Sequence, residues 1–134
     1  MSIAVAFTVS LIVFAAVDFA WLSVMGPRLY QPVIGDLMAA KVAIAPAVLF
    51  YLIYWGGVTA LATAPAIRMG SPGKAVATAA IVALVAYATY DLTNQATLRA
   101  WAWKLTLADL VWGVFATSLA ALAGYFAGRA VGQL

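Results

Sequence analysis

Long apolar segments alternate with short polar ones along the whole of this chain. Four of the apolar segments reach the length of about 20 residues that a helix needs to cross the hydrocarbon core of a bilayer. Gly26 and Pro27 should end the first helix and Pro65 the second, because Gly and Pro are strong helix-stop signals. We therefore expect helices at about residues 3–25, 43–63, 75–98 and 105–130.

The connections between these segments are short, so successive helices should run antiparallel. The segment Arg28–Lys41 is too polar to span the membrane, and Pro32 and Gly35 interrupt it. We expect a short interfacial helix or a loop there. None of the apolar segments alternates with a period of two, which excludes a membrane-spanning β-barrel. The expected fold is an all-α, polytopic membrane protein: one domain over residues 1–134, built as a bundle of four transmembrane helices.

Composition supports the same class. Only 8% of the residues are charged and 67% are hydrophobic, with a mean hydropathy of +1.07, whereas soluble domains have about 25% charged residues. The first segment lacks the charged start and cleavage site of a removable signal peptide, so we expect it to remain as a membrane anchor. Lys and Arg are divided almost evenly between the two expected faces, which leaves the orientation open.

The chain has no cysteine and no histidine. Thiolate zinc sites, iron–sulfur clusters, Cys nucleophiles and His-based triads are therefore excluded. The net charge of +3 comes from scattered basic residues that form no patch, so a nucleic-acid partner is not expected. We expect membrane lipids as partners, and neither a cofactor nor a metal site.

All four acidic residues are aspartates, and three of them fall inside the expected helices. Asp18 and Asp91 lie about seven residues before the ends of their helices, and Asp109 about four after the start of its helix. At 1.5 Å per residue, all three lie roughly 6–10 Å beneath the same membrane face. A carboxylate at a helix centre costs about 3 kcal/mol even on the lower scales, so such residues usually face a cavity or a partner. A shared pocket is the simplest arrangement.

Neighbouring residues support such a pocket. Tyr87, Asp91 and Asn94 share one face of the third helix. The pattern Asp-x-x-Trp occurs on the first and fourth helices, which places an indole N–H beside each acid and hints at an inverted repeat. Arg99 is the expected basic partner of the acids, because its guanidinium binds carboxylates bidentately. The candidate ligand-binding residues are Asp18, Trp21, Tyr87, Asp91, Asn94, Arg99, Asp109 and Trp112, and the three acids are also the catalytic candidates.

Small residues form an edge on the fourth helix, including Gly113, Gly124 and Gly128. Such an edge allows helices to approach closely, either within the bundle or between copies of the chain. The aromatic residues Tyr30, Tyr51, Tyr54 and Trp55 are interpreted as a belt at the membrane interface or as filling of the bundle.

The run Tyr87–Asn94, followed by Leu105-Thr106, Asp109 and Trp112-Gly113, resembles the DUF2177 family of small bacterial membrane proteins. Asp18-x-x-Trp21-Leu22 and the segment Leu49–Tyr54 resemble that family too. The connector after Leu98 lacks a proline that the family pattern would have. The resemblance implies four transmembrane helices and a bacterial cytoplasmic (inner) membrane location, and it implies no activity.

Three hypotheses follow. In the first, a polar pocket centred on Asp91 and Asp109, with Asp18 in support, binds or modifies a lipid or another amphiphile. In the second, the protein is a non-enzymatic subunit of a larger membrane complex, and the acids only hold its helices together. The third is a proton- or ion-coupled carrier, which four helices could form only as a homodimer. Whether the protein is an enzyme stays open.

Overall fold

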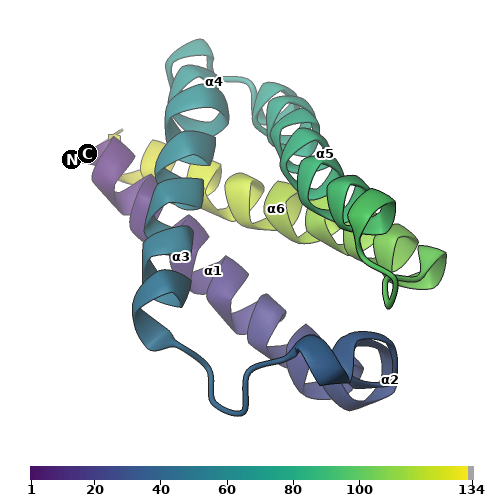
Figure 1. Ribbon diagram of the computed structural model, residues 1–134. Helices are drawn as coiled ribbons and strands as arrows, with labels where there is room; N and C mark the ends of the chain where they lie inside the picture. Colours follow the sequence, from purple (N-terminus) through teal and green to yellow (C-terminus); the bar gives the residue numbers. More distant parts are fainter. Residues whose placement is uncertain (133–134) are drawn as a thin grey trace.

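The computed structural model describes residues 1–132, and it is helical without strands in that part of the chain (Figure 1). Four helical stretches are long and apolar enough to cross a membrane, as the sequence predicted. They run through Ser2–Leu37, Ile44–Met69, Pro72–Thr97 and Trp103–Gly132. The all-α membrane fold is therefore confirmed, although the ends of the first two spans differ from the prediction.

The first span continues through the expected stop at Gly26 and Pro27. Helix α1 (Ser2–Met25) passes directly into the wider turn η1 (Gly26–Tyr30), a π-helical segment, which leads into α2 (Gln31–Ile34) and η2 (Gly35–Leu37). Pro27 lies in the first turn of η1. A change of helical period relaxes the bonding pattern where a proline has no N–H to donate. The α-helix therefore ends at Met25, where the sequence placed its end, but the helical span continues to Leu37.

Pro65 is accommodated in the same way. Helix α3 (Ile44–Val58) passes through a second π-helical segment, η3 (Thr59–Thr63), into α4 (Ala64–Met69), and Pro65 lies in the first turn of α4. The span ends at Gly70, whose φ of 63° is left-handed and whose following residue, Ser71, donates its N–H to the carbonyl of Ala66. This glycine, not the proline, ends the second span.

The last two spans agree closely with the prediction. Helix α5 (Pro72–Thr97) begins at Ser71, whose hydroxyl accepts the backbone N–H of Lys74 as an N-cap. Helix α6 (Trp103–Gly132) follows after a short turn. Both helices are single and unbroken, because neither has a proline beyond its first turn.

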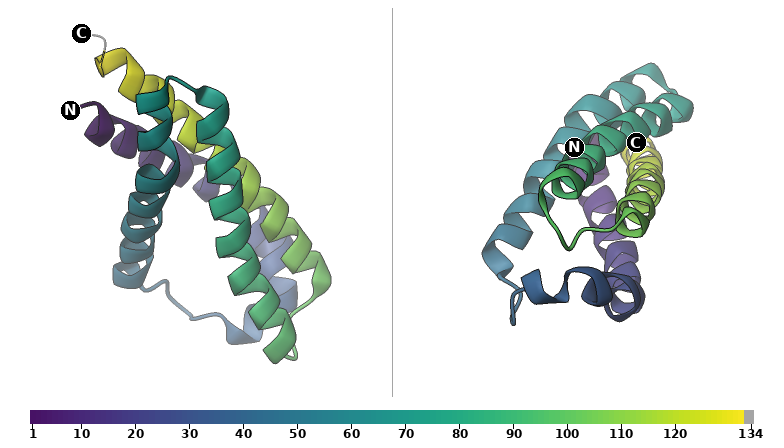
Figure 2. Two further views of the ribbon diagram at one scale, coloured as in Figure 1. Left: turned by 90° about the horizontal axis from the view of Figure 1, so that it is seen from above. Right: turned by 45° about the vertical axis from the view of Figure 1, so that its right-hand side comes forward.

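Helix α6 is the central element of the bundle, since it packs along both α1 and α5 (Figure 1). The second span packs on the others mainly through η3 and α4, while the first half of α3 leans away from α5 (Figure 2). Consistent with this, many apolar side chains of α3 are exposed, Ile53 by 66%. The core that joins α1, α3, η3, α5 and α6 is rich in alanine and contains Phe14, Trp55, Val58, Ala62, Ala79, Ala116, Ala120 and Ala121.

The small-residue edge of α6 is used within the chain. A Cβ atom at Gly124 would lie 2.0 Å from Ser10 Oγ and 2.6 Å from the carbonyl oxygen of Ala6 on α1, and one at Gly128 would lie 2.9 Å from the carbonyl oxygen of Ser2. The two backbones are therefore in direct contact along this edge. Helix α1 covers this edge at Gly124 and Gly128, and the ring of Tyr87 on α5 covers it at Gly113.

Candidate functional site

Asp91 and Asp109 lie at the same depth on adjacent antiparallel helices. Asp91 lies six residues before the end of α5, and Asp109 six residues after the start of α6, so each is about 9 Å from its helix end. With 26 residues, α5 is about 39 Å long and also crosses part of the headgroup layers, because the hydrocarbon is only about 30 Å thick. Both carboxyl groups therefore lie near the boundary between headgroups and hydrocarbon.

Asp109 is satisfied by a side chain from the end of the first span. The hydroxyl of Tyr30, in η1, donates to Asp109 Oδ1, and the indole of Trp21 donates to the Tyr30 oxygen at 3.0 Å. Leu29 packs with Trp101 and Leu105 beside these bonds. The π-helical segment thus places Tyr30 over the start of α6.

Asp18 is satisfied by two neutral donors. Tyr51 donates its hydroxyl at 2.7 Å and Trp112 its indole N–H at 3.2 Å. The rings of Trp112 and Trp21 are stacked, with centroids 4.4 Å apart and an angle of 8° between their planes. The indole of each Asp-x-x-Trp pattern therefore acts on the acid of the other helix. Trp112 donates directly to Asp18, and Trp21 donates to Tyr30, which donates to Asp109. The spacing placed the indole of Trp112 beside Asp109 on its own helix, whereas the structure pairs it with Asp18 on α1.

Asp91 differs from the other two acids. It is completely buried, and neither of its carboxylate oxygens has a hydrogen-bond partner within residues 1–132. The carboxyl group of Asp109 lies within hydrogen-bonding reach of it, and two adjacent carboxyl groups can share one proton. Apart from that proton, residues 1–132 supply no donor to Asp91. Buried polar groups are normally satisfied, so an exception of this kind calls for an explanation.

Of the remaining predicted site residues, Tyr87 and Asn94 lie on α5 with Asp91, and Arg99 lies outside the helix. Tyr87 lies one turn before Asp91, close to Asp18 and Asp109, and its ring lies against Gly113. Asn94 is half-buried on the same helix. Arg99 is exposed in the turn after α5, and none of the donors to the three acids is an arginine or a lysine. The expected pairing of Arg99 with the acids was wrong.

Tyr30 and Tyr51 were missed as site residues, because the sequence analysis assigned them to the interface or to packing. They lie 79 and 33 residues away from the acids to which they donate. No local spacing connects residues that far apart. The useful signal was the tyrosines of the first three spans near the membrane face that contains the acids, since a buried carboxylate without a cation needs neutral donors.

Among residues 1–132, no group of three or more His, Cys, Asp or Glu side chains is arranged to hold a metal ion. The acids instead form a chain of contacts in which Asp91 meets Asp109, and Asp109 lies within electrostatic range of Asp18. We refer to Asp18, Asp91 and Asp109 as the acid cluster.

Replacing Tyr30 by phenylalanine should lower the free energy of unfolding in detergent by about 1–3 kcal/mol, because Asp109 then loses the hydrogen bond that the Tyr30 hydroxyl donates. Thermal unfolding followed by circular dichroism measures this change. Tyr90→Phe is the matched control, since Tyr90 is 60% exposed and should have little effect. Equal stability of the two variants would contradict a role for Tyr30 in holding the first span onto α6.

Comparison with known proteins gives one match. The family model described as "Predicted membrane protein (DUF2177)" matches residues 3–126 of the chain. The chain belongs to the DUF2177 family. The match includes every residue of the acid cluster and both tyrosines that donate to it. No curated protein and no solved structure matches this DUF2177 chain.

Proposed function

We propose that this DUF2177 protein binds an amphiphile in the bacterial cytoplasmic membrane, through a headgroup that donates hydrogen bonds to Asp91 and Asp109. The observation that carries the proposal is the complete burial of Asp91, whose carboxyl group has no neighbour to bond with in residues 1–132 except the carboxyl group of Asp109. The other two acids accept hydrogen bonds from tyrosine and tryptophan side chains.

The energetics support the same interpretation. A buried, unpartnered polar group costs about 1–3 kcal/mol, and more when it is charged, and a second carboxyl beside it adds repulsion. The pair can share one proton, which leaves carboxyl oxygens free to accept, and hydroxyl and ammonium groups have the donors for them. A lipid headgroup can reach this depth, near the hydrocarbon boundary. Tyr87 and Asn94 lie on the same helix and would contact the ligand beside the headgroup.

The pair also offers chemistry. A proton shared between two adjacent carboxyl groups can be transferred to or from a bound hydroxyl or amine, as in general acid–base catalysis. This is the acid–base chemistry open to a chain without histidine or cysteine. Binding is the proposed function, and modification of the bound lipid would be an extension of it.

Phosphatidylethanolamine and phosphatidylcholine provide a direct test, because only the first has N–H donors on its headgroup. The purified protein, exchanged into micelles that contain equal amounts of both, should retain phosphatidylethanolamine selectively in native mass spectrometry. Asp91→Asn should reduce this preference about tenfold or more, the effect of losing a hydrogen bond to a charged group.

Asp36→Asn is the matched control, since Asp36 is exposed in η2 and its replacement makes the same change of charge. It should retain the lipid as the unmodified protein does. Equal retention of both lipids by the unmodified protein, or an unchanged preference in Asp91→Asn, would refute the proposal. A foreign polypeptide that co-purifies in stoichiometric amount, with no retained lipid, would favour the subunit hypothesis instead.

A further inference from the structure

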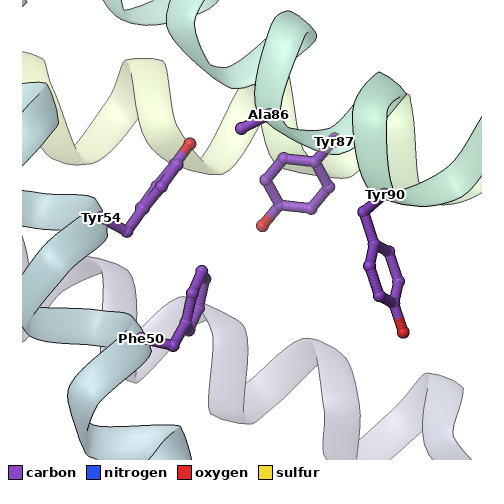
Figure 3. Close-up of a pocket in the computed structure, with 5 residues that line it drawn as sticks. All are labelled: Phe50, Tyr54, Ala86, Tyr87 and Tyr90. Atoms are coloured by element: carbon purple, nitrogen blue, oxygen red, sulfur yellow. The ribbon is translucent and has the colours of Figure 1, made fainter.

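A cleft opens sideways between α3 and α5, in the half of the bundle that contains the acid cluster. Phe50 and Tyr54 of α3 form one wall, and Ala86, Tyr87 and Tyr90 of α5 form the other (Figure 3). Its lining is almost entirely apolar, and its volume is about 260 Å³. The cleft exists because α3 and α5 approach each other at η3 and α4 and diverge from there (Figure 2).

Such a cleft opens to the lipid of the bilayer. Both walls belong to membrane-spanning helices, and Phe50 and Tyr90 are 47% and 60% exposed at its mouth. Typical pockets for small ligands measure about 300–1,000 Å³, so this cleft is too small for a whole lipid. A segment of one acyl chain fits it better, with the rest of the lipid outside.

One polar group points into the cleft. The hydroxyl of Tyr87 is directed into the space between Tyr54 and Phe50, whereas the hydroxyl of Tyr54 is turned away and paired with Thr117 at 2.8 Å (Figure 3). A hydroxyl in an apolar environment is stabilised by a hydrogen-bond acceptor, so a ligand in the cleft should offer one to Tyr87. An acyl ester carbonyl is such an acceptor. The wall that contains Tyr87 is therefore suited to an ester-linked chain.

Tyr87 connects the cleft to the acid cluster. Its hydroxyl lies within electrostatic range of Asp18 and Asp109, and Asp91 follows one turn later on the same helix. The ring packs directly on the backbone of Gly113, where a Cβ atom would lie 2.5 Å from it. A lipid whose chain occupies the cleft therefore has its ester groups at Tyr87 and its headgroup within reach of the acids.

We infer that the cleft between α3 and α5 is a lateral entrance that holds one acyl chain of a bilayer glycerolipid, with Tyr87 as the donor to its ester group. The inference rests on the proposed function for the destination of the headgroup, and it adds the class of ligand and its path of entry. The lipid enters from the bilayer between these two helices and reaches the acids without leaving the membrane.

Ala86→Phe tests the entrance by filling the cleft, and Ala77→Phe is its control. Ala77 is also exposed on α5, and nine residues at 3.6 per turn place it on the opposite side of that helix. The probe is 1-palmitoyl-2-oleoyl phosphatidylethanolamine, and its retention is measured by native mass spectrometry. Ala86→Phe should lower retention about tenfold or more, the effect of overpacking a filled site, while Ala77→Phe retains the lipid. Full retention by Ala86→Phe would overturn the inference.

Photo-crosslinking provides a second measurement that does not depend on filling the cleft. The photoreactive residue p-benzoylphenylalanine is introduced at Phe50, or at Phe126 as an exposed control on α6, and the protein is irradiated after free lipid has been removed in detergent. A lipid adduct at position 50 and none at 126 supports the inference, and equal labelling overturns it.

The two proposals fail in different ways. Loss of retained lipid in Asp91→Asn together with full retention in Ala86→Phe overturns the entrance and leaves the acid site standing. Loss in Ala86→Phe together with an unchanged headgroup preference in Asp91→Asn overturns the acid site as the destination of the headgroup. Loss in both variants, with Ala77→Phe and Asp36→Asn unaffected, supports both proposals.

Discussion

Gly124→Ala is expected to destabilise the protein by about 3 kcal/mol or more, at the upper end of the usual effect of overpacking. The new methyl group would lie 2.0 Å from Ser10 Oγ and 2.6 Å from the carbonyl oxygen of Ala6. The serine can rotate away, but the carbonyl belongs to the backbone of α1. Helices α1 and α6 must therefore separate, and their separation disturbs the acids that each of them contributes. Thermal unfolding in detergent measures the change.

Gly57→Ala makes the same change where there is room for it. Gly57 lies inside α3, and a Cβ atom at this position meets nothing within 4 Å. Alanine should stabilise the helix there by about 0.5–1 kcal/mol, because glycine loses more backbone freedom on folding. Effects of the same sign at Gly57 and Gly124 would contradict the close packing of α1 on α6.

Asp91→Asn and Asp18→Asn are expected to change stability in opposite directions. Asp18 accepts hydrogen bonds from Tyr51 and Trp112, and an amide at this position would turn its own N–H groups toward one of those donors. The loss should be about 1–3 kcal/mol, the cost of leaving a buried donor unpaired. Asp91 has no donor to lose apart from a proton shared with Asp109, and an amide there could donate to Asp109 in place of that proton. Asp91→Asn should therefore raise the free energy of unfolding by about 1 kcal/mol or more.

Unfolding of the delipidated protein measures this contrast, since bound lipid would itself stabilise the folded state. Residues that bind a ligand often lower the free energy of unfolding of the protein without that ligand. A loss of stability in Asp91→Asn as large as that in Asp18→Asn would show that Asp91 is structural, and the proposed binding site would lose its main support.

Much of the fold could be predicted from the sequence, because the bilayer imposes a simple rule. Apolar runs of sufficient length must become helices, so all four spans were found. The depth of Asp91 and Asp109 followed from counting residues toward helix ends. Both results depend only on local sequence.

Other features depend on contacts that local sequence does not contain. Gly26-Pro27 and Pro65 suggested helix ends, whereas a turn of wider period carries the helix past each proline. Arg99 was expected to pair with the acids because opposite charges attract. The structure places neutral Tyr and Trp donors there instead, and they avoid the cost of removing a guanidinium from water.

The wider turn η1 also determines the direction in which the Tyr30 side chain points. A π-helical turn contains one residue more than an α-helical turn, and each residue of an α-helix rotates the chain by about 100°. Through Gly26–Tyr30, that additional residue turns the Tyr30 side chain toward Asp109. The direction of the Tyr30 side chain thus depends on the number of residues before it. A one-residue deletion anywhere between Asp18 and Tyr30 would therefore turn Tyr30 away from Asp109, near the start of α6 and far away in sequence.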